Sequence, residues 1–353
     1  HGILIAVHPH LDHALGVDYR QHFFRPYGGD GLDDQRTHLY AKQLGMRGIF
    51  RLTLFKDIWI GSGCGVGGGS LGYANTLYRA FPDFYSSEQR KGLADWESEL
   101  APHYDEAERM LGVTEYDDDG PADLLLKEYS ESIGVGDTYR RTRVGVFLGQ
   151  PGKTVADPYF DGDGPDRTGC IKCGSCMVGC RHGAKNTLRK NYLWFAEKLG
   201  VKIFIERSVT DIKPLDARGA TGYEVTHQKS GALGKRSAEK LRARGVVVAA
   251  GALGTNRLLQ RCKLGGSLPN ISDRLGYVVR TNSESIMAVM APKDYPDDFT
   301  HSIAITSSIY TDPATHIEVV TYGKGGDSQS LLFNLMIEAG KRGTRPLHFL
   351  AAA

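Results

Sequence analysis

TGCIKCGSCMVGCRHGAKNTLRKNYL, residues Thr168 to Leu193, is the stretch that decides how this sequence is interpreted. Four of the six cysteines of the chain fall inside it, with the spacing C-x2-C-x2-C-x3-C. Thiols this close together are typical of metal centres, because thiolates are strong ligands for iron and zinc. The spacing predicts a set of four metal ligands, which are Cys170, Cys173, Cys176 and Cys180.

The nature of that site stays open at the level of sequence. Bacterial ferredoxins use the same spacing for iron–sulfur clusters, but a proline follows their fourth cysteine, whereas Arg181 follows it here. A cluster held by three cysteines, a cluster completed by a remote ligand such as Cys262, and a zinc site are alternatives. Two readings need no metal: a thiol-lined turn, or four cysteines packed as small hydrophobic residues.

Two other stretches suggest a site for an anionic cofactor. GCGVGGGSLGYANTLY (Gly63 to Tyr78) follows a predicted strand over 51–60, and its consecutive glycines let backbone N–H groups approach a pyrophosphate. VVVAAGALGTNRLL (Val246 to Leu259) predicts a buried parallel strand, a glycine turn and a helix over 254–262. Either motif could equally form an ordinary structural turn, so neither alone settles a function.

Together with the cysteine stretch, these motifs resemble the glucose–methanol–choline (GMC) flavoprotein oxidoreductases, most closely their cholesterol-oxidase-like branch. The resemblance runs from about Leu39 to the C-terminus. It implies a fold of the α/β class that also contains α+β parts. An FAD-binding domain, with an incomplete Rossmann-like part, would adjoin a β-sheet substrate domain. We expect an irregular region at 1–60, FAD-binding elements at 61–275 with a cysteine-rich insert at 168–183, and part of the substrate domain at 276–353.

The resemblance also implies which residues hold the cofactor. Gly67, Gly68, Gly69 and Ser70 match the segment that lies along the flavin's pyrophosphate and ring. Asn75 matches the position where the family's loop reaches the isoalloxazine, and Val209 the position that holds the adenine through its backbone. Ala250 and Gly251 fall in the second family signature, which packs against the cofactor.

The implied activity is FAD-dependent oxidation of a hydroxyl on a bulky apolar alcohol, such as a 3β-hydroxysteroid, with oxygen or an unknown acceptor. In the steroid oxidases a carboxylate then shifts a double bond. The candidate for this proton transfer is Glu318, with His316 as its neighbour, in the segment THIEVVTYGKG (Thr315 to Gly325). One alternative is a dehydrogenase that passes electrons through a cysteine-bound iron–sulfur cluster. Another is a catalytically incomplete fragment.

The ends of the chain motivate that last alternative. We find neither the family's first glycine fingerprint before the matching part nor its C-terminal catalytic histidine, and so expect truncation at both ends.

A histidine pattern near the N-terminus suggests another class of protein. The segment His8-Pro9-His10-Leu11-Asp12-His13 matches the H-x-H-x-D-H pattern of metallo-β-lactamase-like hydrolases. The further ligands that such a zinc site needs are not evident in the following sequence.

Bulk properties narrow the class further. A net charge of +2, from 43 Lys and Arg against 41 Asp and Glu, argues against nucleic-acid binding. No apolar run approaches the ~20 residues of a membrane helix. Clustered cysteines suit a reducing compartment, so we expect a cytoplasmic protein, with membrane-surface contact or secretion as alternatives.

The periodicity of the chain predicts its remaining elements. Helices are expected over 39–48, 86–111 and 190–199, and a loop-rich region over 113–165. Strands are expected over 201–206, 208–213, 222–228 and 244–250, and extended segments near 277–291, 301–310 and 316–322.

Overall fold

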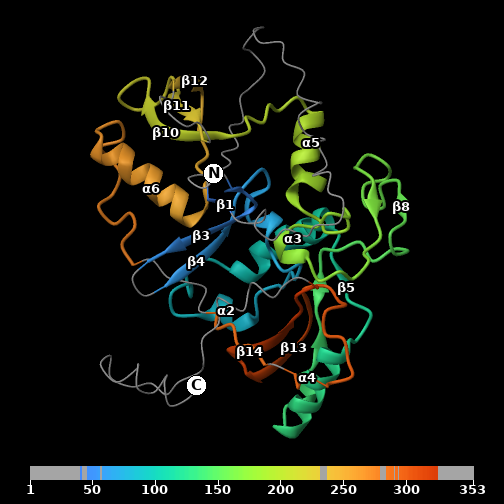
Figure 1. Ribbon diagram of the computed structural model, residues 1–353. Coiled ribbons are helices and arrows are strands. Elements are labelled where there is room, and N and C mark those ends of the chain that lie inside the picture. The colour runs from blue at the N-terminus through green and yellow to red at the C-terminus, as the bar shows by residue number, and fades with distance from the viewer. Residues whose placement is uncertain are drawn as a thin grey trace, which may run out of the picture.

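The computed structural model describes residues 40–41, 46–55, 58–230, 237–278, 284–289, 291–292 and 294–324. Figure 1 places the sheet of β10 (Arg207–Pro214), β11 (Tyr223–Lys229) and β12 (Glu239–Ala243), with helix α6 (Gly251–Leu264), in its upper part. Strands β13 (Ile305–Asp312) and β14 (Thr315–Val320) and helix α4 (Pro121–Ser132) lie in its lower part. The β3–β4 hairpin lies between them in this view. The histidine pattern at His8–His13 and the segment from 325 onward lie outside the described residues, so the expectations for both ends of the chain stay predictions.

A hairpin leads directly into the glycine-rich stretch. Strand β3 (Phe50–Leu54) pairs antiparallel with β4 (Trp59–Gly63), so the single strand predicted over 51–60 is two strands. The helix predicted over 39–48 is wrong, because β1 (Tyr40–Ala41) pairs there with β2 (Met46–Arg47). The glycines at positions 45 and 48 lower the helix propensity of that segment, which favours the strand pair over a helix.

Three helices follow the glycine stretch: α2 (Pro82–Ser86), α3 (Trp96–Leu111) and α4 (Pro121–Ser132). Helix α3 begins where Asp95 accepts a hydrogen bond from the Ser98 backbone N–H, and it ends at Gly112, which has the left-handed φ of 55°. The helical prediction over 86–111 is therefore confirmed for its second half. The loop-rich prediction over 113–165 missed α4, whose apolar residues are consecutive and not spaced by a helical turn.

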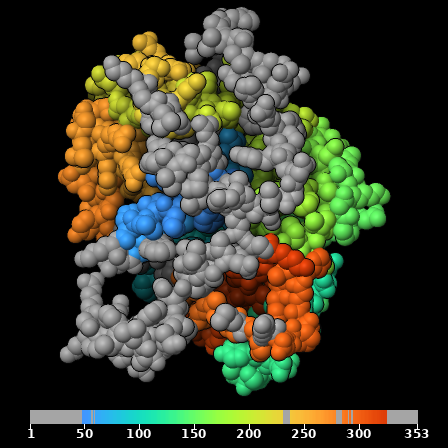
Figure 2. All heavy atoms as spheres, viewed as in Figure 1, coloured from blue at the N-terminus to red at the C-terminus, as the bar shows by residue number. Residues whose placement is uncertain are grey.

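Helix α4 is held on the lower sheet by one buried carboxylate. That sheet has the order β14 (Thr315–Val320), β13 (Ile305–Asp312), β6 (Arg140–Arg141), all antiparallel. Asp123, in the first turn of α4, accepts hydrogen bonds from the Gly120 backbone N–H and the hydroxyls of Thr306 and Ser307. Figure 2 shows α4 directly below the residues of this sheet.

The upper part is built from β10 (Arg207–Pro214), β11 (Tyr223–Lys229) and β12 (Glu239–Ala243), joined as an antiparallel sheet. Helix α6 (Gly251–Leu264) packs against β10. Its core consists of the buried residues Ile212, Leu258 and Cys262, with partly buried Val209, Val246 and Val248 around them.

The strands predicted over 201–206 and 244–250 are not formed. Both segments are rich in apolar residues, yet neither has a ladder partner among the described residues, and 246–249 carry no regular structure. Apolar composition predicts a buried strand only where a neighbouring strand satisfies its backbone groups. Val247 is 74% exposed, in line with a segment that no sheet covers.

Short elements complete the chain around the cysteine stretch. Helix α5 (Tyr192–Lys198) confirms the helix predicted over 190–199. The strand predictions over 208–213, 222–228 and 316–322 agree with β10, β11 and β14 within about two residues, the usual uncertainty of element ends. The short elements are β5 (Thr114–Glu115), β7 (Arg143–Val144), β8 (Thr154–Val155), β9 (Arg167–Thr168), η3 (Gly68–Leu71), η4 (Gly136–Thr138), η5 (Cys176–Val178) and η6 (Leu188–Lys190).

Within the described parts of the chain, no helix is long and apolar enough to cross a membrane.

A charge network fixes the segment that follows the glycine stretch, and it gives a prediction for acid stability. Arg79 and Arg143 each donate two hydrogen bonds to the Glu108 carboxylate, at 2.5–3.0 Å. Arg79, followed by Arg143, lowers the pKa of Glu108 from 4.5 to about 2, against the opposing effect of burial. A carboxylate with a lowered pKa in the folded chain stabilises it above pH 4.5, and that stabilisation is lost as pH falls toward 2.

We therefore expect Glu108→Gln to lower the free energy of unfolding by about 1 kcal/mol at pH 7, since both arginines are partly exposed and solvent screens the pairs. The difference from the wild type should shrink between pH 4.5 and 2 in urea titrations. Glu106→Gln is the control on the same helix, because the ion pair of Glu106 among the described residues is with the exposed Arg109. A difference independent of pH would contradict this explanation.

Candidate functional site

The glycine stretch forms a tight loop whose backbone faces open space. A Cβ on Gly63 would lie 2.4 Å from the Gly68 carbonyl oxygen, so the loop closes on itself at this glycine. Gly67 and Gly68 have φ of 108° and 54°, a region that glycine adopts without strain. Among the described residues, a Cβ on Gly68 or Gly69 would meet nothing within 4 Å. The loop thus leaves its backbone at these two residues approachable by a ligand.

Ser70 ties this loop to the cysteine stretch. Its hydroxyl donates to the Gly67 carbonyl at 2.7 Å and accepts from the Leu188 backbone N–H at 3.0 Å. The side chain that sequence interpretation assigned to the cofactor therefore also holds the loop in shape.

Asn75 is fully buried and bonded at both ends of its amide. The side chain donates to the Ile305 carbonyl at 3.3 Å and accepts from the Ala304 N–H at 3.2 Å, which attaches the glycine stretch to β13. Its own backbone carbonyl accepts from the Gly145 N–H at 2.8 Å. Asn75 has a left-handed φ of 63°, which asparagine tolerates better than most residues.

The other expected cofactor residues gather in the upper part. Val209 lies on β10, beside a β-bulge, and packs against the core of α6. Gly251 opens α6 with a φ of 69° and nothing within 4 Å of a Cβ built there. Ala250 precedes it, and the Ala250 backbone N–H donates to Thr255 at 3.1 Å. The N-terminus of this 14-residue helix is therefore a second place where backbone dipoles favour an anion.

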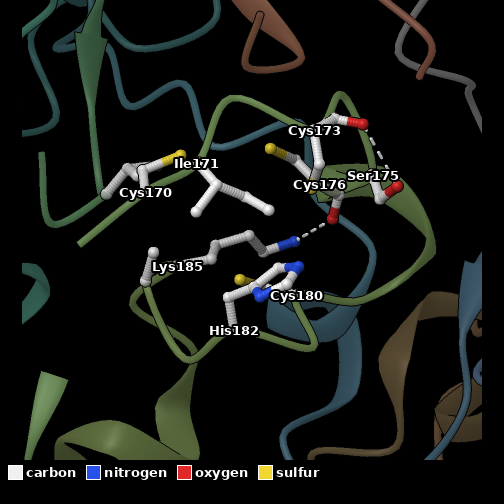
Figure 3. Close-up of a pocket in the computed structure, with 10 residues that line it drawn as sticks. Cys170, Ile171, Cys173, Ser175, Cys176, Cys180, His182 and Lys185 are labelled. Carbon is white, nitrogen blue, oxygen red and sulfur yellow. Dashed lines mark hydrogen bonds between the residues drawn. The ribbon is translucent and has the colours of Figure 1, made fainter. Parts of the chain in front are cut away.

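Three of the four clustered cysteines belong to a hydrophobic core, and the fourth, Cys173, lines a small cavity beside them. Cys176 is buried there with Val144 and Ile303, and Cys170 and Cys180 pack against the same cluster. Figure 3 shows Ile171 and the Lys185 side chain between the labelled cysteines. The cavity that these residues line has a volume of about 10 Å³, room for one water at most.

The structure does not support the metal-ligand prediction for Cys170, Cys173, Cys176 and Cys180. In the part of the chain that it describes, no group of three or more His, Cys, Asp or Glu is placed to hold a metal ion. Burial raises the pKa of the Cys176 thiol to about 12, because desolvation in this core disfavours the thiolate. Cys262, the suggested remote ligand, lies in the separate core of α6.

Lys185 joins the cysteine stretch to the glycine stretch from inside. It is 2% exposed, and its ammonium donates to the carbonyls of Leu71, Tyr73 and Cys176 at 3.0, 2.7 and 2.7 Å. The ammonium also lies 4.4 Å from the centre of the Tyr73 ring. Burial lowers the pKa of Lys185 to about 8. All three protons of the charged form have acceptors, so we assign it a structural role.

The remaining candidates, His316 and Glu318, lie together on β14. Their register partners on β13 are Tyr310 and Ser308, so these four side chains belong to one face of the hairpin. His316 Nε2 is 3.6 Å from Glu318 Oε1, and the His316 and Tyr310 rings are 5.5 Å apart. The carboxylate of Glu318 is partly exposed, at 21%, and can reach a ligand.

A tyrosine that sequence interpretation missed completes this group. Tyr78, the last residue of the glycine stretch, donates its hydroxyl to Glu318 Oε1 at 2.6 Å, and its ring meets the His316 ring edge-on at 5.8 Å. Desolvation, and next the hydrogen bond to Glu318, raise the pKa of Tyr78 well above its ordinary value. The structure thus brings the expected proton-transfer residues against Tyr78, the last residue of the stretch Gly63 to Tyr78.

The chain is similar in sequence to known proteins over most of its length. Residues 164–276 match the family model for GMC oxidoreductases. The chain is 46% identical over 318 residues to a cholesterol oxidase of Mycobacterium tuberculosis strain H37Rv, covering 88% of this chain and 54% of the relative. It is 45% identical over 321 residues to a cholesterol oxidase of Acinetobacter baumannii, covering 89% and 57%. The chain spans about half the length of these curated relatives.

The family resemblance and the α/β fold class expected from the sequence are thereby confirmed. The chain belongs to the GMC oxidoreductase family, in its cholesterol-oxidase-like branch.

Proposed function

We propose that the protein is an FAD-dependent oxidoreductase that oxidises a hydroxyl group on a bulky apolar alcohol, specifically the 3β-hydroxyl of a steroid, with oxygen as the final acceptor. The observation that carries the steroid assignment is the partly exposed Glu318 carboxylate, joined to the end of the glycine stretch by Tyr78. Simple alcohol oxidation needs no such carboxylate, whereas moving a double bond does. The names of the relatives support the same substrate class.

The residues present fit FAD. The open backbone at Gly68 and Gly69 would lie against the pyrophosphate or the ring, since a side chain there would fill the space that a ligand needs. Gly251 offers the same open approach at the N-terminus of α6, where the helix dipole favours a phosphate. Val209 would meet the adenine through its backbone. When bound, FAD supplies the two-electron acceptor for the oxidation.

The chain's own residues then act on the product of that oxidation. A 3-keto steroid with a double bond between C5 and C6 is acidic at C4. Glu318 accepts the proton from C4 and returns it at C6, so that the double bond moves to C4–C5 with no change in oxidation state. Tyr78 borders the carboxylate, and Tyr310 packs against the neighbouring His316, so aromatic surface that suits an apolar ring system lies close by.

Incubation of the protein and FAD with a 3β-hydroxy-5-ene steroid tests the proposal. The expected product is the conjugated 4-en-3-one, formed with an equal amount of hydrogen peroxide, and a long-chain primary alcohol should react much more slowly. Oxidation of the long-chain alcohol in preference to the steroid would overturn the substrate assignment. Turnover with artificial acceptors but not with oxygen would favour a dehydrogenase.

The variant Gly69→Val tests whether the glycine loop contributes to cofactor binding. The new side chain meets no protein atom within 4 Å of its Cβ, so we expect the melting temperature of the protein without FAD to change little. FAD affinity should fall by at least about tenfold, because the side chain occupies the approach to the backbone. Gly245→Val is the matched control, since that glycine is equally open and lies outside the cofactor set. Equal loss in both variants, measured by flavin fluorescence titration, would contradict the assignment of this loop.

A further inference from the structure

Tyr78 connects two parts of the site that are 240 residues apart in sequence. One is the glycine stretch, Gly63 to Tyr78, which ends at this tyrosine, and the other is Glu318 on β14. The 2.6 Å hydrogen bond between them is the direct side-chain link from the proposed cofactor loop to the proposed proton-transfer residue. Because a phenol donates only one proton, its orientation toward Glu318 Oε1 is fixed by this contact.

The surroundings of Glu318 give its carboxylate few other means of orientation. His316 Nε2, at 3.6 Å from Oε1, is beyond normal hydrogen-bond distance. The Ser308 hydroxyl lies opposite Glu318 in register, but it interacts with the Tyr78 hydroxyl, whose pKa it lowers against the larger effect of desolvation. Tyr78 is thus the one side chain that, among the described residues, donates a short hydrogen bond to this carboxylate.

The tyrosine itself is held from two directions. Its neighbour Arg79 is anchored to Glu108 on α3, at 2.8 and 2.7 Å. The Tyr78 ring contacts the His316 ring edge-on, and His316 in turn packs against Tyr310. The Arg140 guanidinium lies 4.6 Å from the centre of the Tyr310 ring. A donor fixed in this way sets the rotamer of Glu318 without needing to touch the substrate.

We propose that Tyr78 is a positioning residue for Glu318: its hydroxyl holds the carboxylate in the orientation that takes the C4 proton of the steroid ketone. The proposal rests on the proposed function for its substrate. It predicts that the tyrosine acts on the isomerisation and leaves the oxidation of the hydroxyl largely unaffected, because the chemistry at C3 does not use Glu318.

Tyr78→Phe tests this role, since it removes the hydroxyl and keeps the ring packed on His316. In the FAD-loaded protein we expect isomerisation to slow by about tenfold to a hundredfold, as misplaced catalytic groups do. The KM for the steroid and the rate of ketone formation should stay within about twofold, so the 5-en-3-one should accumulate.

A second readout needs no turnover. In protein labelled with ¹³C at the glutamate carboxyl carbons, the resonance that disappears in Glu318→Gln belongs to Glu318. It should shift in Tyr78→Phe and stay in place in Tyr129→Phe, a control at an exposed tyrosine of α4. An unshifted Glu318 resonance together with unchanged isomerisation would overturn the role of Tyr78 and leave the proposed function standing. A shifted resonance in a protein that does not oxidise steroids would support the contact and overturn the proposed substrate.

Discussion

Replacing Glu318 with glutamine is expected to separate the two reactions of the proposed enzyme. Glutamine keeps the size of the side chain but cannot take the C4 proton, so isomerisation should slow by about 10²- to 10⁴-fold, the usual contribution of a general base. Oxidation of the hydroxyl should continue at a similar rate. The product should change from the conjugated 4-en-3-one to the 5-en-3-one, which chromatography and ultraviolet absorbance distinguish.

The matched control for this variant is Glu128→Gln, which alters an exposed glutamate of α4 that is remote from β14 in the sequence. It should give the wild-type product at the wild-type rate. If Glu318→Gln forms the conjugated ketone as fast as the wild type, the assignment of this carboxylate is wrong. If both reactions fall together, the side chain serves binding or folding instead.

Lys185→Met is expected to have the largest effect on stability. It removes three hydrogen bonds at once and leaves the buried carbonyls of Leu71, Tyr73 and Cys176 without the donor that they share. Each buried group left unpaired costs about 1–3 kcal/mol, while relief from burying a charge offsets part of the sum. We expect the free energy of unfolding to fall by about 3 kcal/mol, a large fraction of the stability of a typical domain.

Urea denaturation followed by circular dichroism measures this change. Lys153→Met is the control, because that lysine is exposed, and it should alter stability by no more than about 0.5 kcal/mol. FAD affinity should fall in Lys185→Met as well, since the lysine fixes the backbone just after Ser70. A variant as stable as the wild type would contradict the role of Lys185 as the internal link between the two stretches.

The motifs were readable from the sequence because each depends on local chemistry. Consecutive glycines at 67–69 imply close backbone approach wherever they occur, and the periodicity of 251–264 and 192–198 is that of a helix packed on one side. The site beyond the motifs was not readable in this way. Tyr78 and Glu318 meet only through the pairing of β13 with β14 and the burial of Asn75, which are long-range contacts.

The cysteines illustrate the limit of spacing as a signal. The same four thiols satisfy a ligand pattern in sequence, and packing decides whether they converge. Here Cys176 lies beside Ala304 and Ile303 in the core, and Lys185 occupies the space between the thiols. Likewise, the apolar runs at 201–205 and 246–250 satisfy the composition of buried strands but find no partner strand in the described structure.

The visible absorption spectrum of the protein after addition of FAD and removal of the excess tests the central claim most directly. Flavin bands at about one FAD per chain, without a broad iron–sulfur absorption, are the predicted result. A protein that retains no flavin would contradict the assignment of the glycine loop and the α6 N-terminus as its binding elements. A brown protein with stoichiometric iron and sulfide would contradict the packing role assigned to the four cysteines.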